Sequence, residues 1–257
     1  MELGIAAWLF GAGVAGGIVN AIAGGATLIT FPAMLAAGLP PVTANASNAV
    51  AISPGHLLAA VADREKLPAL DRRFGLALAA ATLGGGAGAL LLLALPAALF
   101  LQPVPLLIGL ATALFAFAPH IQAWTTRRRA FAAPHPCRAL ARGTATLAAV
   151  SLYGGFFGAG LGVMLSAVLS IADPDDIRRV KVMKNLLATA VSLAAMVIFI
   201  AQGAVRWDAT LAMLAGALAG GYAGGHLVRV LPARAVRRSV IAAGAFMSLY
   251  YALRIWF

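Results

Sequence analysis

Apolar residues occur along the chain in long runs, and most polar residues fall in the short stretches between them. A helix that crosses the hydrocarbon core of a bilayer needs about 20 residues. Six runs approach or reach that length: 46–62, 74–95, 104–120, 186–201, 209–228 and 239–257. Two further apolar segments, 3–39 and 143–172, are too long for a single ordinary span. The pattern predicts an all-α, polytopic membrane protein.

Composition agrees with this prediction, because 62% of the 257 residues are hydrophobic and only 11% are charged. Such a chain has too little polar surface to solvate a water-soluble globular domain. Glu2 stands where a secretory signal would carry a basic residue, so we expect the N-terminal stretch to be the first membrane segment. The single cysteine, Cys137, allows neither an intrachain disulfide nor a cysteine-based metal site, and we expect no metal and no other cofactor.

The chain contains an internal repeat. Residues 71–96 align without a gap on residues 207–232, with 10 identities in 26 positions. At nearly the same offset, GGIVNAIAGG near the start aligns with YGGFFGAGLG at 153–162, and Asn48 aligns with Asn185. Both copies present a glycine-broken segment, a polar helix start, a glycine-rich helix, a proline and a last helix, in that order. We therefore predict three parts: a first transmembrane repeat at 1–121, a basic cytoplasmic linker at 122–142 and a second transmembrane repeat at 143–257.

The basic residues indicate how the chain crosses the membrane. If each glycine-broken segment crosses once, the two sides carry 11 and 8 basic residues, which is hardly a bias. If each segment instead dips in and returns, or crosses twice, 17 of the 19 Lys and Arg residues share one side. Only Arg206 and Arg254 then lie on the other side. Because basic loops stay in the cytoplasm, the second arrangement is favoured, and it leaves open whether the segments are re-entrant hairpins or double crossings.

The favoured arrangement has consequences for orientation and partners. Each repeat has three spans beside its broken segment, so the two repeats are predicted to be inverted with respect to each other. Both termini of this multi-pass protein would face the outer side of the membrane, away from the basic loops. The net charge of +11 is explained by topology, and we expect no nucleic-acid partner.

The two broken segments are the candidate binding site, because transporters with inverted repeats bind substrate near paired broken helices. Where a helix restarts inside the membrane, its first N–H groups lack partners and its dipole attracts an anion. The predicted restarts comprise Gly24, Gly25 and Thr27 in the first repeat, and Gly158, Gly160 and Gly162 in the second. The same glycines would also suit close helix packing, and the sequence leaves both readings open.

Polar clusters begin the helices that follow the broken segments. NASN at 45–48 supplies Ser47 and Asn48, and KVMKN at 181–185 supplies Lys184 and Asn185. Lys184 would lie inside the membrane, and no acidic residue occurs in an apolar run away from its ends, so its predicted partner is a bound anion. Alternatively, Lys184 extends to the interface. The two amides could donate to an anion or bond the free carbonyls of the broken segments, and both readings stay open.

Other features receive simpler interpretations. The glycine clusters at 84–88 and 220–224 are not accompanied by the polar residues of a phosphate-binding motif, which favours a role in helix packing over phosphate binding. His56 and His226 could relay protons, but they are not at equivalent repeat positions, and a hydrogen-bonded packing role is favoured for both. No serine has a nearby histidine and acid in a loop, so we do not expect an enzyme.

Two runs resemble the motifs of a known family. GGIVNAIAGGATLITFPAMLAAGLPPVTANASNAV at 16–50 resembles the first-repeat motif of the sulfite exporter TauE/SafE family, the TSUP permeases. YGGFFGAGLGVML at 153–165, followed by VKVMKNLLATAVSLAAMVIF, is similar to its second-repeat motif. The resemblance covers essentially the whole chain. It implies an inner-membrane carrier that exports small sulfur-containing anions, such as sulfite, sulfoacetate or other organosulfonates.

The residues themselves favour an anion without choosing one. A sulfonate or sulfite spreads its charge over three oxygens, which two helix N-termini with Asn48, Asn185 and Lys184 could bind. The expected mechanism is alternating access between the two inverted halves. An anion channel, or a carrier of another small anion such as a carboxylate, is the alternative. The expected partners are the anion and the lipid bilayer, and a homodimer is compatible with the sequence.

Overall fold

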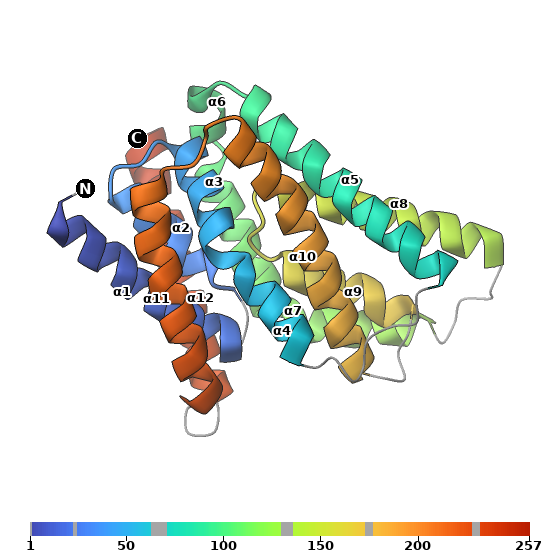
Figure 1. The fold of residues 1–257 in the computed structure, drawn as a ribbon. Helices are drawn as coiled ribbons and strands as arrows, with labels where there is room; N and C mark the ends of the chain where they lie inside the picture. The colour runs from blue at the N-terminus through green and yellow to red at the C-terminus, as the bar shows by residue number, and fades with distance from the viewer. Residues whose placement is uncertain (1, 23–24, 63–70, 130–135, 173–176, 228–231) are drawn as a thin grey trace.

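The structure is a computed structural model that describes residues 2–22, 25–62, 71–129, 136–172, 177–227 and 232–257. Regular structure in these residues is entirely helical, as the sequence predicts (Figure 1). The helices are α1 Leu3–Ile22, α2 Thr27–Ala36, α3 Pro41–Ile52, α4 Pro54–Ala62, α5 Arg72–Ala94, α6 Ala97–Leu101, α7 Val104–Arg129, α8 Pro136–Phe156, α9 Leu161–Ala172, α10 Ile177–Ala201, α11 Trp207–Leu227 and α12 Ala233–Trp256.

Several helices are long and apolar enough to cross a membrane. Within the described residues, five candidate spans meet these criteria: Leu3–Ile22, Arg72–Ala94, Ala97–Ile121, Val180–Ala201 and Arg234–Trp256. The chain is therefore an all-helical protein of the polytopic membrane class. Many large apolar side chains on the outer faces, such as Leu83, Phe117 and Val197, are exposed, as expected of surfaces that contact lipid rather than water.

Each apolar segment that is too long for one span contains two helices. α1 ends at Ile22 and α2 begins at Thr27, while α8 ends at Phe156 and α9 begins at Leu161. Between these helices Gly25, Gly158 and Gly160 have φ values of +94°, +77° and +83°, in the left-handed region that side chains with a Cβ rarely adopt. The chain can therefore change direction sharply at both places.

One apolar run differs from the prediction of a continuous helix. The run 46–62 is divided between α3 and α4, which begins at Pro54. Proline has no N–H to donate to the carbonyl four residues earlier, so the helical hydrogen-bond ladder is interrupted here. α4 consequently starts as a separate short helix beside α10.

Glycines allow two pairs of helices to pack with backbone against backbone. A Cβ on Gly17 of α1 would lie 2.3 Å from the carbonyl oxygen of Ala217 in α11, and one on Gly220 would lie 2.1 Å from that of Val14. In the pair α5–α8, a Cβ on Gly88 would lie 2.0 Å from the carbonyl oxygen of Leu152. The packing role predicted for the glycine clusters at 84–88 and 220–224 is confirmed.

α7 and α12 run antiparallel and are joined along their length. The Trp256 indole donates to the carbonyl of Gln102 at 3.1 Å, and the Ser248 hydroxyl donates to that of Pro105 at 2.8 Å. At the other end, Arg237 donates to the carbonyl of Phe115 at 2.7 Å. Both chain termini lie on one side of the molecule, at the upper left of Figure 1, together with α6.

Candidate functional site

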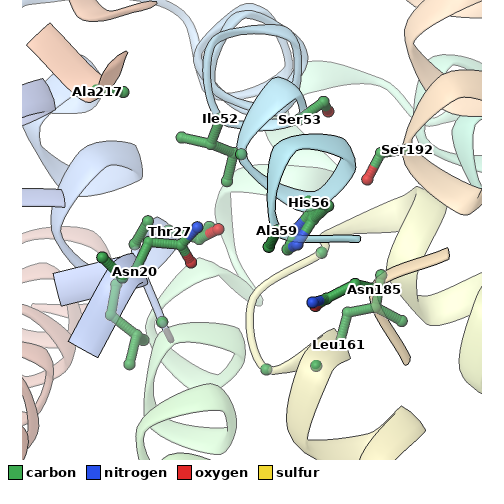
Figure 2. Close-up of a pocket in the computed structure, with 18 of the residues that line it drawn as sticks. Asn20, Thr27, Ile52, Ser53, His56, Ala59, Leu161, Asn185, Ser192 and Ala217 are labelled. Atoms are coloured by element: carbon green, nitrogen blue, oxygen red, sulfur yellow. The ribbon is translucent and has the colours of Figure 1, made fainter. Parts of the chain in front are cut away.

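A cavity of about 1070 Å³ lies where the starts of α2 and α9 meet α3, α4 and α10. Figure 2 shows Thr27 and Asn20 on one side of this space and Asn185 and Leu161 on the other. The His56 ring extends from α4 between them. Residues that are far apart in the sequence thus share one space within a membrane-spanning helical bundle.

The structure brings most of the predicted site residues together. The lining includes Gly25, Thr27, Asn48, Gly158, Gly160, Gly162, Lys184 and Asn185. Gly24 lies outside the described residues. Ser47 is fully buried but is not part of the lining, because its hydroxyl oxygen accepts a hydrogen bond from the backbone N–H of Arg206 at 2.9 Å. Neighbouring residues of a helix point about 100° apart, so Ser47 turns away from the cavity that Asn48 faces.

The first side of the cavity is built around the start of α2. The N–H of Leu28 donates to the carbonyl of Gly25 at 3.1 Å, which closes the first turn. Thr27 lines the cavity and is 6% exposed. The Phe115 ring of α7 lies against the turn, since a Cβ on Gly25 would be 3.1 Å from it. Glycine is therefore required here for its backbone conformation and for this contact.

The second side is built around the start of α9. The Tyr153 hydroxyl donates to the carbonyl of Ala159 at 2.8 Å and fixes the turn between α8 and α9. The Lys184 side chain runs past Gly162, since a Cβ on that glycine would be 3.9 Å from the lysine Cδ. Asn185 is 3% exposed and points into the cavity (Figure 2). A cation and an amide thus lie beside the N-terminus of α9.

Two buried amides at the cavity have unused hydrogen-bonding capacity. Asn45 and Asn48 are 2% and 1% exposed, and neither side-chain oxygen has a hydrogen-bond partner among the described residues. The Asn45 nitrogen donates to the carbonyl of Phe156 at 2.9 Å. Because the oxygen and nitrogen of an amide are assigned from their surroundings, either end of the Asn48 group can face a ligand. A buried polar atom without a hydrogen-bond partner raises the free energy of the folded state. A polar ligand that bonds to it in the cavity would therefore stabilise the protein.

Several lining residues were not predicted from the sequence. Asn20, Ser53 and Ser192 belong to this group, as does Arg237. The sequence favours a packing role for His56, whereas its ring reaches the cavity (Figure 2). His226 is exposed and does not line the cavity, and its Nδ1 lies 3.1 Å from the carbonyl oxygen of Tyr222. The helix break at Pro54, which sets the position of His56, is the signal that could have distinguished the two histidines.

The charged groups that line the cavity are basic. Lys181 and Lys184 come from α10, and Arg234 and Arg237 come from α12. No carboxylate occurs among the described lining residues. The lining is therefore electrostatically suited to an anion rather than a cation.

Arg237 is held by the backbone of α7. Its guanidinium donates to the carbonyls of Phe115 and Ala116 at 2.7 and 3.1 Å and lies 5.7 Å from the centre of the Phe115 ring. Pro119 lies in α7 four residues after Phe115 and has no N–H to offer that carbonyl. Arg237 replaces the missing donor and joins α12 to α7 at this point.

Two parts of the cavity lining differ in exposure. Leu58 in α4 and Tyr222 in α11 are lining residues near the C-terminal ends of their helices, and they are 57% and 77% exposed. Phe157 also lines the cavity, and its ring packs edge-on against Phe31, with the centroids 5.2 Å apart. Both of these phenylalanines are buried. The cavity is therefore accessible beside the ends of α4 and α11 and is closed where these aromatic rings pack.

Comparisons with known proteins agree with these observations. A probable membrane transporter protein of Haemophilus influenzae is 29% identical over 254 residues, which cover 96% of this chain and 95% of the relative. The probable membrane transporter protein YfcA of Escherichia coli strain K12 is 28% identical over 242 residues, 93% of this chain and 87% of the relative. No solved structure matches the chain.

The relatives support membrane transport as the function and agree with the expectation that the protein is not an enzyme. The family model described as sulfite exporter TauE/SafE matches residues 9–251, nearly the whole chain. The protein therefore belongs to the sulfite exporter TauE/SafE family.

Proposed function

We propose that the protein carries small sulfur-containing anions, such as sulfite, sulfoacetate or other organosulfonates, across the cell inner membrane, in the direction of export. The observation that carries this proposal is the cavity, which has basic groups, unpaired amide capacity and no carboxylate among its described lining residues. The family's description as sulfite exporters supports the sulfur-containing class of substrate.

The anion would lie between the starts of α2 and α9. The N–H groups of Leu28 and Val163 close the first turns of α2 and α9 on the carbonyls of Gly25 and Gly160. The two helices would therefore attract the anion mainly through their dipoles, which present partial positive charge to the cavity. Asn48 and Asn185 would add hydrogen bonds from opposite sides, and Lys184 would add the full positive charge. Hydrogen bonds between charged groups are shorter and stronger than neutral ones, so Lys184 is the main contributor to affinity.

We further propose that two inverted halves expose this site alternately to the two sides of the membrane. α7 and α12, the last helices of the predicted repeats, are antiparallel, as the pairs Gln102–Trp256 and Phe115–Arg237 require. The pairing of α1 with α11 has its counterpart in the pairing of α8 with α5, which is the pattern expected if the halves exchange roles. A cavity with exposed lining residues beside α4 and α11 and with buried, packed aromatic rings elsewhere supports a carrier over a continuous pore.

The proposed orientation follows the positive-inside rule. The helix ends that border the predicted basic loops, such as those of α4, α10, α11 and α12, would face the cytoplasm, and both termini would face the periplasm. The cavity would then be open to the cytoplasm in this structure. Attachment of a membrane-impermeant label to a cysteine at residue 2 tests the orientation, and labelling from the cytoplasm alone would contradict it.

The experiment that tests the function combines binding and transport. Purified protein would be titrated with sulfite, methanesulfonate, sulfoacetate, sulfate, thiosulfate and acetate, and then reconstituted for uptake and for electrical recording. We expect saturable uptake of a sulfur-containing anion that binds more tightly than acetate. Tighter binding of acetate would make the protein a carboxylate carrier, and single-channel currents would make it an anion channel.

A further inference from the structure

We propose that His56 binds a proton together with the anion, so that the cavity takes up one anion and one proton and transport is coupled to the proton gradient. This inference rests on the anion site of the proposed function and adds a proton site to it. A monovalent anion and a proton would then move together without net charge.

The position of His56 is set by the break between α3 and α4. Pro54 begins α4, and the backbone N–H of His56 donates to the carbonyl of Ser53 at 3.0 Å, closing the first turn of the new helix. The imidazole extends from this turn into the cavity, between Thr27 and Asn185 (Figure 2). It therefore lies between the two helix starts that would bind the anion.

The groups around His56 are basic or neutral. α10 presents Lys184, which interacts electrostatically with His56, and also Lys181. α12 contributes Arg234 and Arg237 to the lining. The other described lining residues with ionisable or amide groups are Tyr222 of α11, Asn185 of α10, Asn45 and Asn48 of α3 and Asn20 of α1. The described lining residues that come from α2, α7 and α9 have no charged side chains.

This arrangement links the proton to the anion. A proton on His56 adds positive charge to a space that already contains Lys184, and no carboxylate among the described lining residues offsets it. An anion between the two groups removes this repulsion, so each ligand favours the binding of the other. The coupling is reciprocal by thermodynamic necessity.

Imidazole is suited to this role because its charge changes between about pH 5 and pH 8. Many proton-coupled transporters use carboxylates within the membrane. Here His56 is the one imidazole among the described lining residues, and it stands at the centre of the site.

The test is a calorimetric titration of the full-length protein with methanesulfonate and with sulfate, whose charge is constant over the pH range used. Titrations near pH 7 in two buffers of different ionisation enthalpy count the protons taken up. We expect about one proton per anion, and affinity that weakens as the pH rises from about 5.5 to about 8, by at most about tenfold per pH unit.

Variants assign the proton to a residue. His56→Gln should bind the anion with heats that do not depend on the buffer and with affinity independent of pH in this range. The matched control is His226→Gln, which changes an exposed histidine outside the cavity and should behave as wild type. His56→Asn is the second variant if His56→Gln does not fold.

The outcomes separate this inference from the proposed function. Anion binding by wild type with no proton uptake, or proton uptake retained in folded His56 variants, would overturn the role of His56 and leave the anion carrier intact. Absence of any anion binding at every pH would overturn both. In proteoliposomes, uptake of methanesulfonate driven by a pH gradient, and lost in His56→Gln, would support the coupling.

Discussion

On the α2 side of the cavity, Thr27 and Asn48 contribute neutral polar groups, whereas on the α9 side Asn185 is accompanied by the cation of Lys184. In the alignment that pairs Asn48 with Asn185, the residue that corresponds to Lys184 is Ser47, which is directed away from the cavity. Under the proposed function, the two similar helix starts would contribute unequally to the binding of the anion. The α2 side would provide hydrogen bonds, and the α9 side would provide hydrogen bonds and charge.

The largest effect expected from this difference is on Lys184. In Lys184→Ala the affinity for methanesulfonate should fall by about ten- to a hundredfold, because a charge-assisted hydrogen bond contributes about 1.5–3 kcal/mol. Isothermal titration calorimetry measures the loss. Arg238→Ala, an exposed position on α12 outside the cavity, is the control. If Lys184→Ala bound and transported every anion as well as wild type, the proposed site would be wrong.

The two turns beside the cavity should differ in their tolerance of a side chain. Gly25→Ala should lower the free energy of unfolding by about 1–2 kcal/mol for the left-handed backbone, with a further loss because the Cβ would meet the Phe115 ring at 3.1 Å. Gly160→Ala shares the backbone cost, but the nearest atom to its Cβ would be the flexible end of Leu114 at 3.4 Å, and the Cα of Ala111 would be at an ordinary contact distance of 3.7 Å. Thermal unfolding in detergent compares them, and equal midpoints would argue against the Phe115 contact.

The two asparagines test whether both sides reach the anion. Asn48→Ala and Asn185→Ala should each weaken methanesulfonate binding by about two- to tenfold, the value of one neutral hydrogen bond. A loss in only one variant would assign the anion to that side of the cavity. Unchanged affinity in both would favour the alternative that these amides serve the backbone of the broken segments.

The smallest effect on affinity is expected at Ser47. Ser47→Ala should change anion affinity by less than about twofold, because its hydroxyl faces Arg206 rather than the cavity. It should nevertheless lower stability by about 1 kcal/mol, since the backbone N–H of Arg206 loses the acceptor that the buried Ser47 hydroxyl provides. A large loss of affinity with unchanged unfolding would restore Ser47 to the site.

Part of this site could be predicted from the sequence, for identifiable reasons. Gly25 and Gly158 were found because a sharp reversal in an apolar segment requires left-handed backbone, which glycine adopts without penalty. Asn48 and Asn185 were found because polar residues at aligned positions in an apolar chain are conspicuous. These signals depend on local conformation and on the internal repeat, and both can be recognised from the order of residues in the chain.

The remainder depends on three-dimensional relations that sequence spacing does not contain. Ser47 and Asn48 are adjacent in the chain, and only the rotation of α3 determines which of them faces the cavity. Asn20 has no polar counterpart at its aligned position in the second repeat, where Phe157 stands, so the repeat gave no indication of its role. Arg237 reaches a carbonyl more than a hundred residues earlier in the chain, a contact that no local pattern records.

The bond between Arg237 and α7 also limits how basic the cavity is in practice. Arg237 lines the cavity, yet its Nη2 group donates to the carbonyls of Phe115 and Ala116, and its guanidinium lies 5.7 Å from the centre of the Phe115 ring. Arg237 therefore joins α12 to α7, the last helices of the two predicted repeats. Selectivity for an anion would then depend mainly on the lining cations other than Arg237. Pro119 causes this, because it has no N–H to donate to the carbonyl of Phe115 and Arg237 donates to that carbonyl instead.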